Sequence, residues 1–521
     1  MTFRRQEAPT RSAKTMTLTF KEKVMNTDKL REAFPQTTVF KDQGLISTFK
    51  AANIPAFLRD WILKRKADAS GRIGNSDELR QYVGKIIPQK SQKLEIIDEA
   101  QQGGATRKFL ANIRVQLNIS SNKHTFEIPD LDIRHSETII EDYVWDRIKD
   151  DVTKTSGGWG LIQLGYLPPD ESRPRGQRNG YLNLLEYKNF CPYTVNLDAF
   201  RKAREQFTIQ EWMDVLLGAI DYNPDGYTDW VQKHTMLTRL LPFIEPRINL
   251  VELAPKGTGK SYLFGRIGKY GWLVSGGILS RAKMFYDVSK RQFGLVAQNE
   301  FVALDEIQSI QFPDPSEMQG ALKAYMEAGE ATFGDIKVTG TAGVILLGNI
   351  PVDNMNEQTD MFRTLPEVFH ESALLDRFHG FIKGRNIPRM NESLKINAWA
   401  LNTEYFSEIM HLMRSQSECL MYRGVVEELV EYPASADTRD TEAVLRICTA
   451  YLKLLFPHVT SADKADVEEF SFYCLRPAIE MRTIIRQQLQ IIDPKEYGKK
   501  NMAVYSVKAK YLKSGGAHGN A

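Results

Sequence analysis

Cysteine is scarce in this sequence, and its spacing argues against two common kinds of site. The 521 residues include four cysteines, none of them in a Cys-x-x-Cys pair. Scattered cysteines are typical of free thiols in a reducing cytoplasm, rather than of a disulfide framework or a zinc site. The eight histidines show no metal-ligand spacing either. We therefore expect a cytoplasmic protein that uses neither.

Long apolar runs are also missing. No stretch approaches the ~20 apolar residues that a membrane-spanning helix needs, and no signal-peptide core is present. The formal net charge of +3 is too small to indicate a nucleic-acid partner by itself. A hydrophobic content of 42% and a charged content of 26% are ordinary for soluble globular proteins. We expect about two to four domains and no membrane partner.

One stretch organises the chain, and it reads N-L-V-E-L-A-P-K-G-T-G-K-S-Y from Asn249 to Tyr262. A short apolar strand leads into a glycine-containing loop and then into a segment that can open a helix. This is the context of a phosphate-binding P-loop, although Ala254 stands where the pattern has its first glycine. The residues that we expect to contact a nucleotide are Pro255, Lys256, Gly257, Thr258, Gly259, Lys260, Ser261 and Tyr262.

Each side chain of this loop has an expected role. Gly257 and Gly259 let the backbone turn its N–H groups inward toward an anion. Lys260 would reach the β- and γ-phosphates, and the Ser261 hydroxyl would hold a magnesium ion. The loop therefore predicts ATP and Mg²⁺ as cofactors.

A pair of carboxylates follows a second apolar strand, Phe301-Val-Ala-Leu-Asp-Glu. Open α/β sheets bind their ligands where parallel strands end, which is where we place this pair. Asp305 can hold magnesium, and Glu306 can orient or deprotonate the attacking water. Together with the P-loop, the pair predicts an NTP hydrolase.

Three further residues complete the predicted site. Asn349 ends the apolar strand Val344–Gly348, and an asparagine in this order resembles sensor 1 of the AAA+ ATPases. Arg377 follows Ala373-Leu-Leu-Asp at a surface turn, which suits an arginine finger offered to a neighbouring subunit; a weak surface pair with Asp376 is the alternative. Arg476 is a candidate for sensor 2 in a helical lid, with ordinary helical pairing among nearby charges as the alternative.

The segments before the P-loop change character twice. A helical pattern covers 28–104, and alternating strands over 105–195 would fit a small OB-type barrel with a basic loop at Arg173–Arg178. A barrel that only mediates subunit contacts fits equally well. Residues 1–27 are basic; we expect a disordered tail, with nucleic-acid attachment as the alternative.

A hairpin is predicted over 329–340, between a helix that ends at Ala328 and the strand that leads to Asn349. Phe333 and Lys337 make it our candidate pore element for contact with DNA. One lysine per subunit around a ring would give about six phosphate contacts and a steep salt dependence.

Several motifs together resemble the BrxL family, the Lon-like AAA+ proteins of bacterial BREX phage-defence systems. They are Phe-Thr-x-x-Glu-Trp at 207–212, the P-loop stretch, Ser-Gly-Gly at 275–277, Leu-Pro-Glu at 365–367, Leu-Asp-Arg-Phe-His at 375–379, Ile-Pro-Arg-Met at 387–390 and the lid stretch from Arg476 to Leu489. The resemblance implies a homo-hexameric ring, single or double, that binds DNA, hydrolyses ATP and acts with other BREX proteins in restricting phage.

The resemblance also sets expectations for domains and activity. We expect an α/β fold with an AAA+ P-loop core and a helical lid, after a helical segment and an OB-like domain; the divisions are 1–27, 28–104, 105–195, a helical linker at 196–245, the core at 246–395, the lid at 396–492 and a basic tail at 493–521. Longer family members carry a C-terminal Lon-like domain, for which the residues after Ile492 are too few, so peptidase activity is not expected.

Three functions stay open on the sequence. A motor that translocates on or remodels DNA is favoured by the two basic tails and Lys337. A protein unfoldase would use Phe333 or Tyr325 to grip polypeptide. A nucleotide switch with slow hydrolysis is the third.

Overall fold

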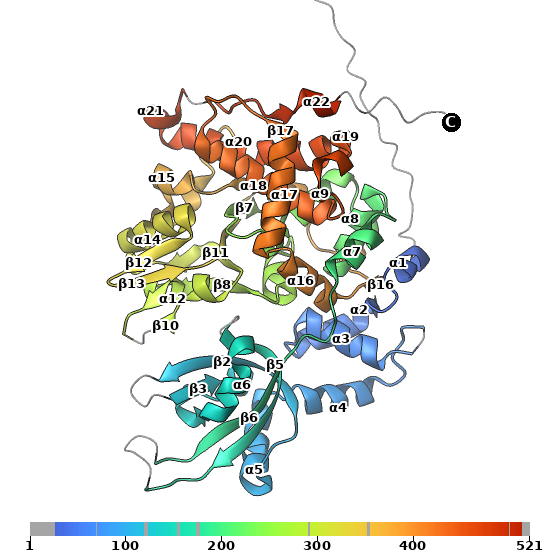
Figure 1. Ribbon diagram of the computed structural model, residues 1–521, viewed down its shortest axis with the longest axis vertical. Coiled ribbons are helices and arrows are strands. Elements are labelled where there is room, and N and C mark those ends of the chain that lie inside the picture. Colours follow the sequence, from blue (N-terminus) through green and yellow to red (C-terminus); the bar gives the residue numbers. More distant parts are fainter. Residues whose placement is uncertain are drawn as a thin grey trace, which may run out of the picture.

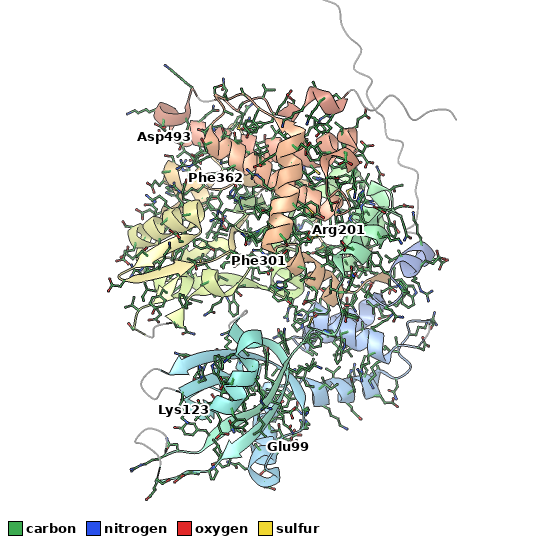
Figure 2. All side chains as sticks on the ribbon, viewed as in Figure 1. Glu99, Lys123, Arg201, Phe301, Phe362 and Asp493 are labelled. Carbon is green, nitrogen blue, oxygen red and sulfur yellow. The ribbon has the colours of Figure 1, made fainter. Side chains whose placement is uncertain are left out.

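The computed structural model describes residues 27–68, 70–118, 123–153, 157–172, 178–289, 292–351, 355–499 and 501–512. Figure 1 shows a larger unit, which holds a sheet and most of the helices, above a smaller β-rich unit. In Figure 2, Phe301 and Phe362 belong to the larger unit, and Glu99 and Lys123 belong to the smaller one. Within the described residues, no helix is long and apolar enough to cross a membrane.

A five-stranded parallel sheet forms the centre of the larger unit. Its order is β15-β7-β14-β11-β8, and each neighbouring pair is parallel. The strands are β7 (Leu250–Ala254), β8 (Gly271–Ile278), β11 (Phe301–Gln311), β14 (Gly343–Asn349) and β15 (Gly380–Lys383). The near-continuous apolar runs of β7 and β14 are buried, as expected of parallel strands covered on both faces. The predicted strands before the P-loop, the acid pair and Asn349 are thereby confirmed, but the acid pair does not end its strand. β11 continues to Gln311, with an irregular register after Asp305 in its pairing with β8.

Short elements lie around this sheet. The P-loop leads into α11 (Lys260–Tyr262), and two antiparallel hairpins join β8 to β11 and β11 to β14. The elements are α12 (Arg281–Met284), β9 (Tyr286–Asp287), β10 (Gln292–Phe293), α13 (Leu295–Gln298), α14 (Pro315–Ala328), β12 (Glu330–Phe333), β13 (Ile336–Thr339) and α15 (Ser372–Leu375). The hairpin predicted over 329–340 is confirmed as β12–β13.

Helices from two distant parts of the chain share one core with the sheet. They are α7 (Leu197–Arg204), α8 (Ile209–Ala219), α9 (Trp230–Thr238), α10 (Leu241–Ile244), α16 (Thr403–Leu412), α17 (Gln416–Leu429), α18 (Thr438–Leu455), α19 (Val467–Phe470) and α20 (Arg476–Ile492). A capping box between Thr208 and Glu211, within the Phe-Thr-x-x-Glu-Trp motif, begins α8. Because Trp212, Tyr422, Tyr451 and Cys474 belong to one buried cluster, the predicted linker and lid pack as one layer (Figure 1).

The predicted helical lid, 396–492, begins with a strand rather than a helix. Trp399 lies in β16 (Ala398–Leu401), which pairs antiparallel with β1 (Thr38–Lys41). Asn402 then caps α16, because its side chain accepts from the backbone N–H groups of Glu404 and Tyr405. Pairing with a strand from the far N-terminus overrides the local helical pattern.

The predicted helical domain 28–104 is not one unit. Its first elements, α1 (Thr27–Ala33), β1, α2 (Gln43–Ala51) and α3 (Ala56–Lys66), pack on the larger unit, and Leu30 and Phe34 enter the core shared by the helices and the sheet. In contrast, α5 (Lys93–Gly103) packs on the β-rich sheet through Ile96 and Ala100, and α4 (Ser76–Ile86) lies at the junction. Lys41 of β1 and Arg59 of α3 hold these first elements against the larger unit, because both are buried in ion pairs with Asp221.

The β-rich unit is a sheet of order β3-β2-β5-β6-β4, in which only the β4–β6 pair is parallel. Its elements are β2 (Phe109–Asn118), β3 (Lys123–Glu127), β4 (Thr138–Ile139), α6 (Asp142–Thr153), β5 (Gly157–Leu167) and β6 (Tyr181–Asn189). An antiparallel bridge between His124 and Ile140 connects the two ends of this order. The sheet therefore curls back on itself around one apolar core.

The predicted C-terminal tail is folded as far as the structure describes it. It forms α21 (Pro494–Tyr497), β18 (Ser506–Val507), which pairs with β17 (Val430–Glu431), and α22 (Ala509–Leu512). Tyr505 and Val507 are buried in the helical core, which holds this segment in place. Residues 1–26, the basic loop residues 173–177 and residues 513–521 lie outside the described part of the chain.

Candidate active site

The P-loop lies at the carboxyl end of β7, an inner strand between β15 and β14. Gly257 and Gly259 both adopt positive φ, of 81° and 82°. A Cβ atom built on Gly259 would lie 2.4 Å from the Tyr222 hydroxyl oxygen, so a larger residue does not fit there. The two glycines therefore have the conformational role that the sequence assigned to them.

Lys260 is a buried cation without a carboxylate partner among the described residues. Its ammonium donates to Asn349 Oδ1 at 2.9 Å and to the Pro255 carbonyl oxygen at 3.3 Å. Burial lowers the pKa of Lys260, although the nearby Glu252 carboxylate raises it. A buried charge needs a counter-charge, so this position suits an anion such as a phosphate group.

The acid pair and Asn349 converge on the same loop. Ser261 Oγ donates to Asp305 Oδ2 at 2.5 Å, so the hydroxyl and the carboxylate predicted to hold magnesium are in contact. Asp305 is buried and Glu306 is exposed. Glu306 has a φ of 49°, a strained conformation for a non-glycine residue that is often found at functional sites.

These side chains line one pocket of about 470 Å³. Its polar end comprises Lys256 to Ser261, Asp305, Glu306 and Asn349. The donor set fits ATP with Mg²⁺: glycine backbone and a buried ammonium for phosphates, and a hydroxyl with a carboxylate for a hard cation. Tyr262 and Met390 line the same pocket.

Arg377 lies at the opposite edge of the sheet from the P-loop. It precedes β15, and the neighbouring His379 N–H donates to the carbonyl of Asn249, just before β7 begins. The four residues of β15 separate the amino ends of the strands, where Arg377 lies, from their carboxyl ends, where the P-loop lies, by about 13 Å. Arg377 Nε lies 3.0 Å from Glu327 Oε2; the Arg377 side chain is only 16% exposed, whereas that of Glu327 is 52% exposed. The alternative pair with Asp376 does not form, since Asp376 turns inward to Arg482 at 2.5 Å.

Arg476 is not brought to the pocket. It is exposed at the start of α20, where its guanidinium carbon lies 5.9 Å from the Phe472 ring centroid. It does not line the pocket that holds Lys260 and Asp305. The alternative pairing with Glu480 is not found either, because Glu480 binds Lys383 at 2.5 Å. Its sensor 2 role remains a prediction.

The predicted pore contact of Phe333 is wrong for this conformation of the hairpin. Phe333 is only 6% exposed, with its ring centroid 5.6 Å from that of Phe285 and 5.2 Å from the Arg281 guanidinium. An aromatic residue before the turn faces inward because its strand is amphipathic. Lys337 is exposed and binds Glu330 at 2.6 Å, which neutralises part of its charge.

Two arginines near the P-loop were missed. Arg239, at the end of α9, is fully buried; its guanidinium binds Glu252 of β7 through two bonds, at 2.9 and 2.5 Å, and donates to the Thr258 carbonyl at 2.7 Å and hydroxyl at 3.0 Å. Arg389 is exposed, with Nε 3.7 Å from a Cβ built on Gly257. Only Arg389 had a sequence signal, since it lies within the Ile-Pro-Arg-Met motif.

The strand order, the P-loop and the adjacent acid pair define a P-loop ATPase domain on a mixed α/β fold. The family model described as "Lon-like protease BrxL-like, ATPase domain" matches residues 182–503, and the one described as "BREX system Lon protease-like protein BrxL N-terminal" matches residues 32–166. The chain belongs to the BrxL family of the BREX defence system, which confirms the resemblance found in the sequence.

Two curated relatives carry the name Lon-like protease BrxL. The one from Escherichia coli O9:H4 (strain HS) is 27% identical over 457 residues, which are 86% of this chain and 62% of that protein. The one from Bacillus cereus (strain H3081.97) is 29% identical over 482 residues, which are 90% of this chain and 67% of that protein. The chain thus spans about two thirds of the length of these relatives.

Proposed function

We propose that the protein is an ATP hydrolase of the AAA+ type. The observation that carries the proposal is the contact of Lys260 with Asn349 and of Ser261 with Asp305 across three neighbouring parallel strands. Lys260 binds phosphate, Asn349 and Glu306 orient the attacking water, and Glu306 receives its proton. When bound, Mg²⁺ neutralises charge on the phosphate oxygens.

We further propose that the active form is a homo-hexameric ring, single or double. The support is the position of Arg377, which is separated from its own pocket by the length of β15 and is paired with the exposed carboxylate of Glu327. In the proposed ring, this arginine acts on a nucleotide held by a neighbouring subunit, as arginine fingers do. Each site is then completed by the next subunit.

We propose that this ring translocates on or remodels DNA in anti-phage defence, together with other BREX proteins. The β-rich unit supports it: five strands in a closed order, one parallel pair and a helix before β5 are features of an OB fold. OB folds bind nucleic acid through the loops between their strands. The loop between β5 and β6 includes the basic stretch Arg173–Arg178.

The ATPase rate with and without double-stranded DNA, at low and moderate salt, tests this proposal. Stimulation that fades steeply with salt, on particles of hexamer mass by mass photometry, is the expected result. Replacing Arg173, Arg175 and Arg178 by alanine should reduce the stimulation but leave the basal rate unchanged. An ATPase rate that does not change with DNA at either salt concentration would refute the proposal that the protein acts on DNA.

A protein remodeller is the second candidate, and exposed apolar side chains favour it. Four large apolar side chains are exposed on β8 and the two hairpins: Ile278 (62%), Val288 (58%), Phe293 (48%) and Ile336 (38%). Val288 and Phe293 belong to the same hairpin, and neighbouring exposed apolar groups are typical of polypeptide contacts. Stimulation by an unfolded protein, without any response to DNA, would favour this function.

A further inference from the structure

Helix α2 forms one wall of the nucleotide pocket, although it lies far before the P-loop in the sequence. Gln43, Ile46, Ser47 and Lys50 line the same pocket as the P-loop and the acid pair. These residues fall in the region matched by the N-terminal family model and outside that matched by the ATPase model. The P-loop, acid pair and sensor motifs give them no role.

The sheet order shows which end of the pocket α2 occupies. β14 and β11, which carry Asn349 and Asp305, lie on one side of β7, whereas β15 lies on the other. The chain after β15 returns to the P-loop, where Met390 N–H donates to the Gly257 carbonyl at 2.8 Å. It then continues to Ile396, which lines the pocket with α2. α2 contacts this segment, because the Gln43 side chain donates to Glu392, whereas Asp305 lies on β11, on the other side of β7.

The side chains at this end differ from those at the phosphate end. Ile46, Ile396, Met390 and the Tyr262 ring present apolar surface, and Gln43 and Ser47 add amide and hydroxyl groups. Lys50 Nζ lies 5.5 Å from the Tyr262 ring centroid. Apolar walls with a few polar groups suit a flat aromatic ring with a hydrogen-bonding edge. A nucleobase with its ribose has this chemistry.

Both flanks of α2 are fixed to the ATPase core. Before it, β1 pairs with β16, and Lys41 donates to Asp221 at 2.8 Å. After it, Arg59 of α3 binds the same carboxylate at 2.7 and 2.8 Å. Tyr262, next to the P-loop serine, donates to Asp221 at 2.5 Å. One buried carboxylate thus links both flanks of α2 to the loop that would hold the nucleotide.

We propose that α2 is the base-side wall of the nucleotide site, so that the N-terminal region selects a nucleoside triphosphate over a bare polyphosphate chain. The inference rests on the proposed ATPase function and adds the residues that recognise the nucleoside. Ile46 contacts the base or ribose, and the phosphate end needs no contribution from it.

Paired variants on one helix test the wall. Ile46→Ala shortens a half-buried aliphatic side chain that lines the pocket. Leu45→Ala is the matched control, because Leu45 does not line the pocket and packs instead on the apolar cluster that includes Phe49. Titration calorimetry of the full chain measures its affinity for Mg·ATP, which occupies the whole site, and for inorganic tripolyphosphate, which occupies only the phosphate end. We expect Ile46→Ala to weaken ATP about five- to tenfold, or ~1 to 1.4 kcal/mol, and to leave tripolyphosphate unchanged.

A second variant fills the space instead of emptying it. Ser47→Trp adds a large side chain at an exposed helical position, so we expect the protein to fold and to lose more ATP affinity than Ile46→Ala does. Equal ATP affinity in Ile46→Ala and Leu45→Ala would overturn the inference, as would parallel losses for ATP and tripolyphosphate. Lys260→Ala distinguishes failure of this inference from failure of the proposed ATPase function. If this variant still binds ATP, the proposed ATPase site is wrong.

Discussion

Replacing Arg239 by methionine should affect stability and nucleotide binding through two separable contacts. Arg239 is fully buried between α9 and the sheet, where it neutralises Glu252 and holds the Thr258 hydroxyl and carbonyl. Methionine keeps most of the side-chain volume but removes the charge and all of these donors. Glu252 then stays in the core as an unpaired carboxylate, and the P-loop loses two hydrogen bonds.

The expected magnitudes follow from these contacts. Breaking one partner of a buried ion pair costs about 3–5 kcal/mol, a large part of the ~5–15 kcal/mol that stabilises a typical domain. Loss of a hydrogen bond from a charged donor costs about 1.5–3 kcal/mol. If most of that falls on the P-loop conformation that binds phosphate, ATP affinity drops about tenfold or more.

A double variant separates the two effects. Arg239→Met with Glu252→Leu removes the orphaned charge, so the urea midpoint should return most of the way to the wild-type value. ATP affinity should stay low, because Thr258 still lacks its donors. The reasoning is refuted if the single variant unfolds at the wild-type urea concentration, or if the double variant recovers nucleotide binding together with stability.

Three further predictions concern the site and its surroundings. Lys260→Ala should abolish ATP binding in a fluorescent-nucleotide displacement assay, and retained affinity would remove the P-loop assignment. Arg377→Ala should reduce turnover at least about 10³-fold with nearly unchanged binding; mixing it with Glu306→Gln subunits should restore part of the activity, and no recovery would contradict a role across subunits. Burial raises the pKa of Glu404 to about 7 from its ordinary 4.5, with Lys269 opposing the shift. The folded state then holds a proton that the unfolded state has released, so stability falls as pH rises from about 4.5 to 7; Glu404→Gln should flatten that part of the melting-temperature profile, and an unchanged slope would contradict it.

The P-loop core was predictable because its signals are local. The apolar run before Pro255 becomes β7, the run before Asp305 becomes β11, and the run before Asn349 becomes β14. Glycines at Gly257 and Gly259 require positive φ, and the structure has it. Each of these features needs only a few consecutive residues, and the parallel sheet then brings the ends of β7 and β14 beside Asp305, in the middle of β11.

The remaining parts depend on pairing between distant segments. Trp399 joins a strand because β1, from the far N-terminus, lies beside it. Lys41 and Arg59 look like ordinary surface charges in the sequence, yet both are buried around Asp221. Phe333 was predicted to contact DNA, yet its ring packs on Phe285. The sequence pattern of a hairpin does not show which of its two faces is buried. No period or spacing in the sequence specifies such partners.

Arg389 and Arg377 are the two arginines that could stabilise charge on the phosphates, one within a chain and one from a neighbouring subunit. Arg389 is exposed beside the P-loop of its own chain, whereas Arg377 lies a strand length away at the other edge of the sheet. A cation that stabilises charge on the phosphates has to approach them within a few ångströms. Arg389 can do so within one chain, but Arg377 can do so only if another copy presents its pocket. Basal turnover by a lone chain would therefore depend on Arg389, and the gain on assembly would depend on Arg377.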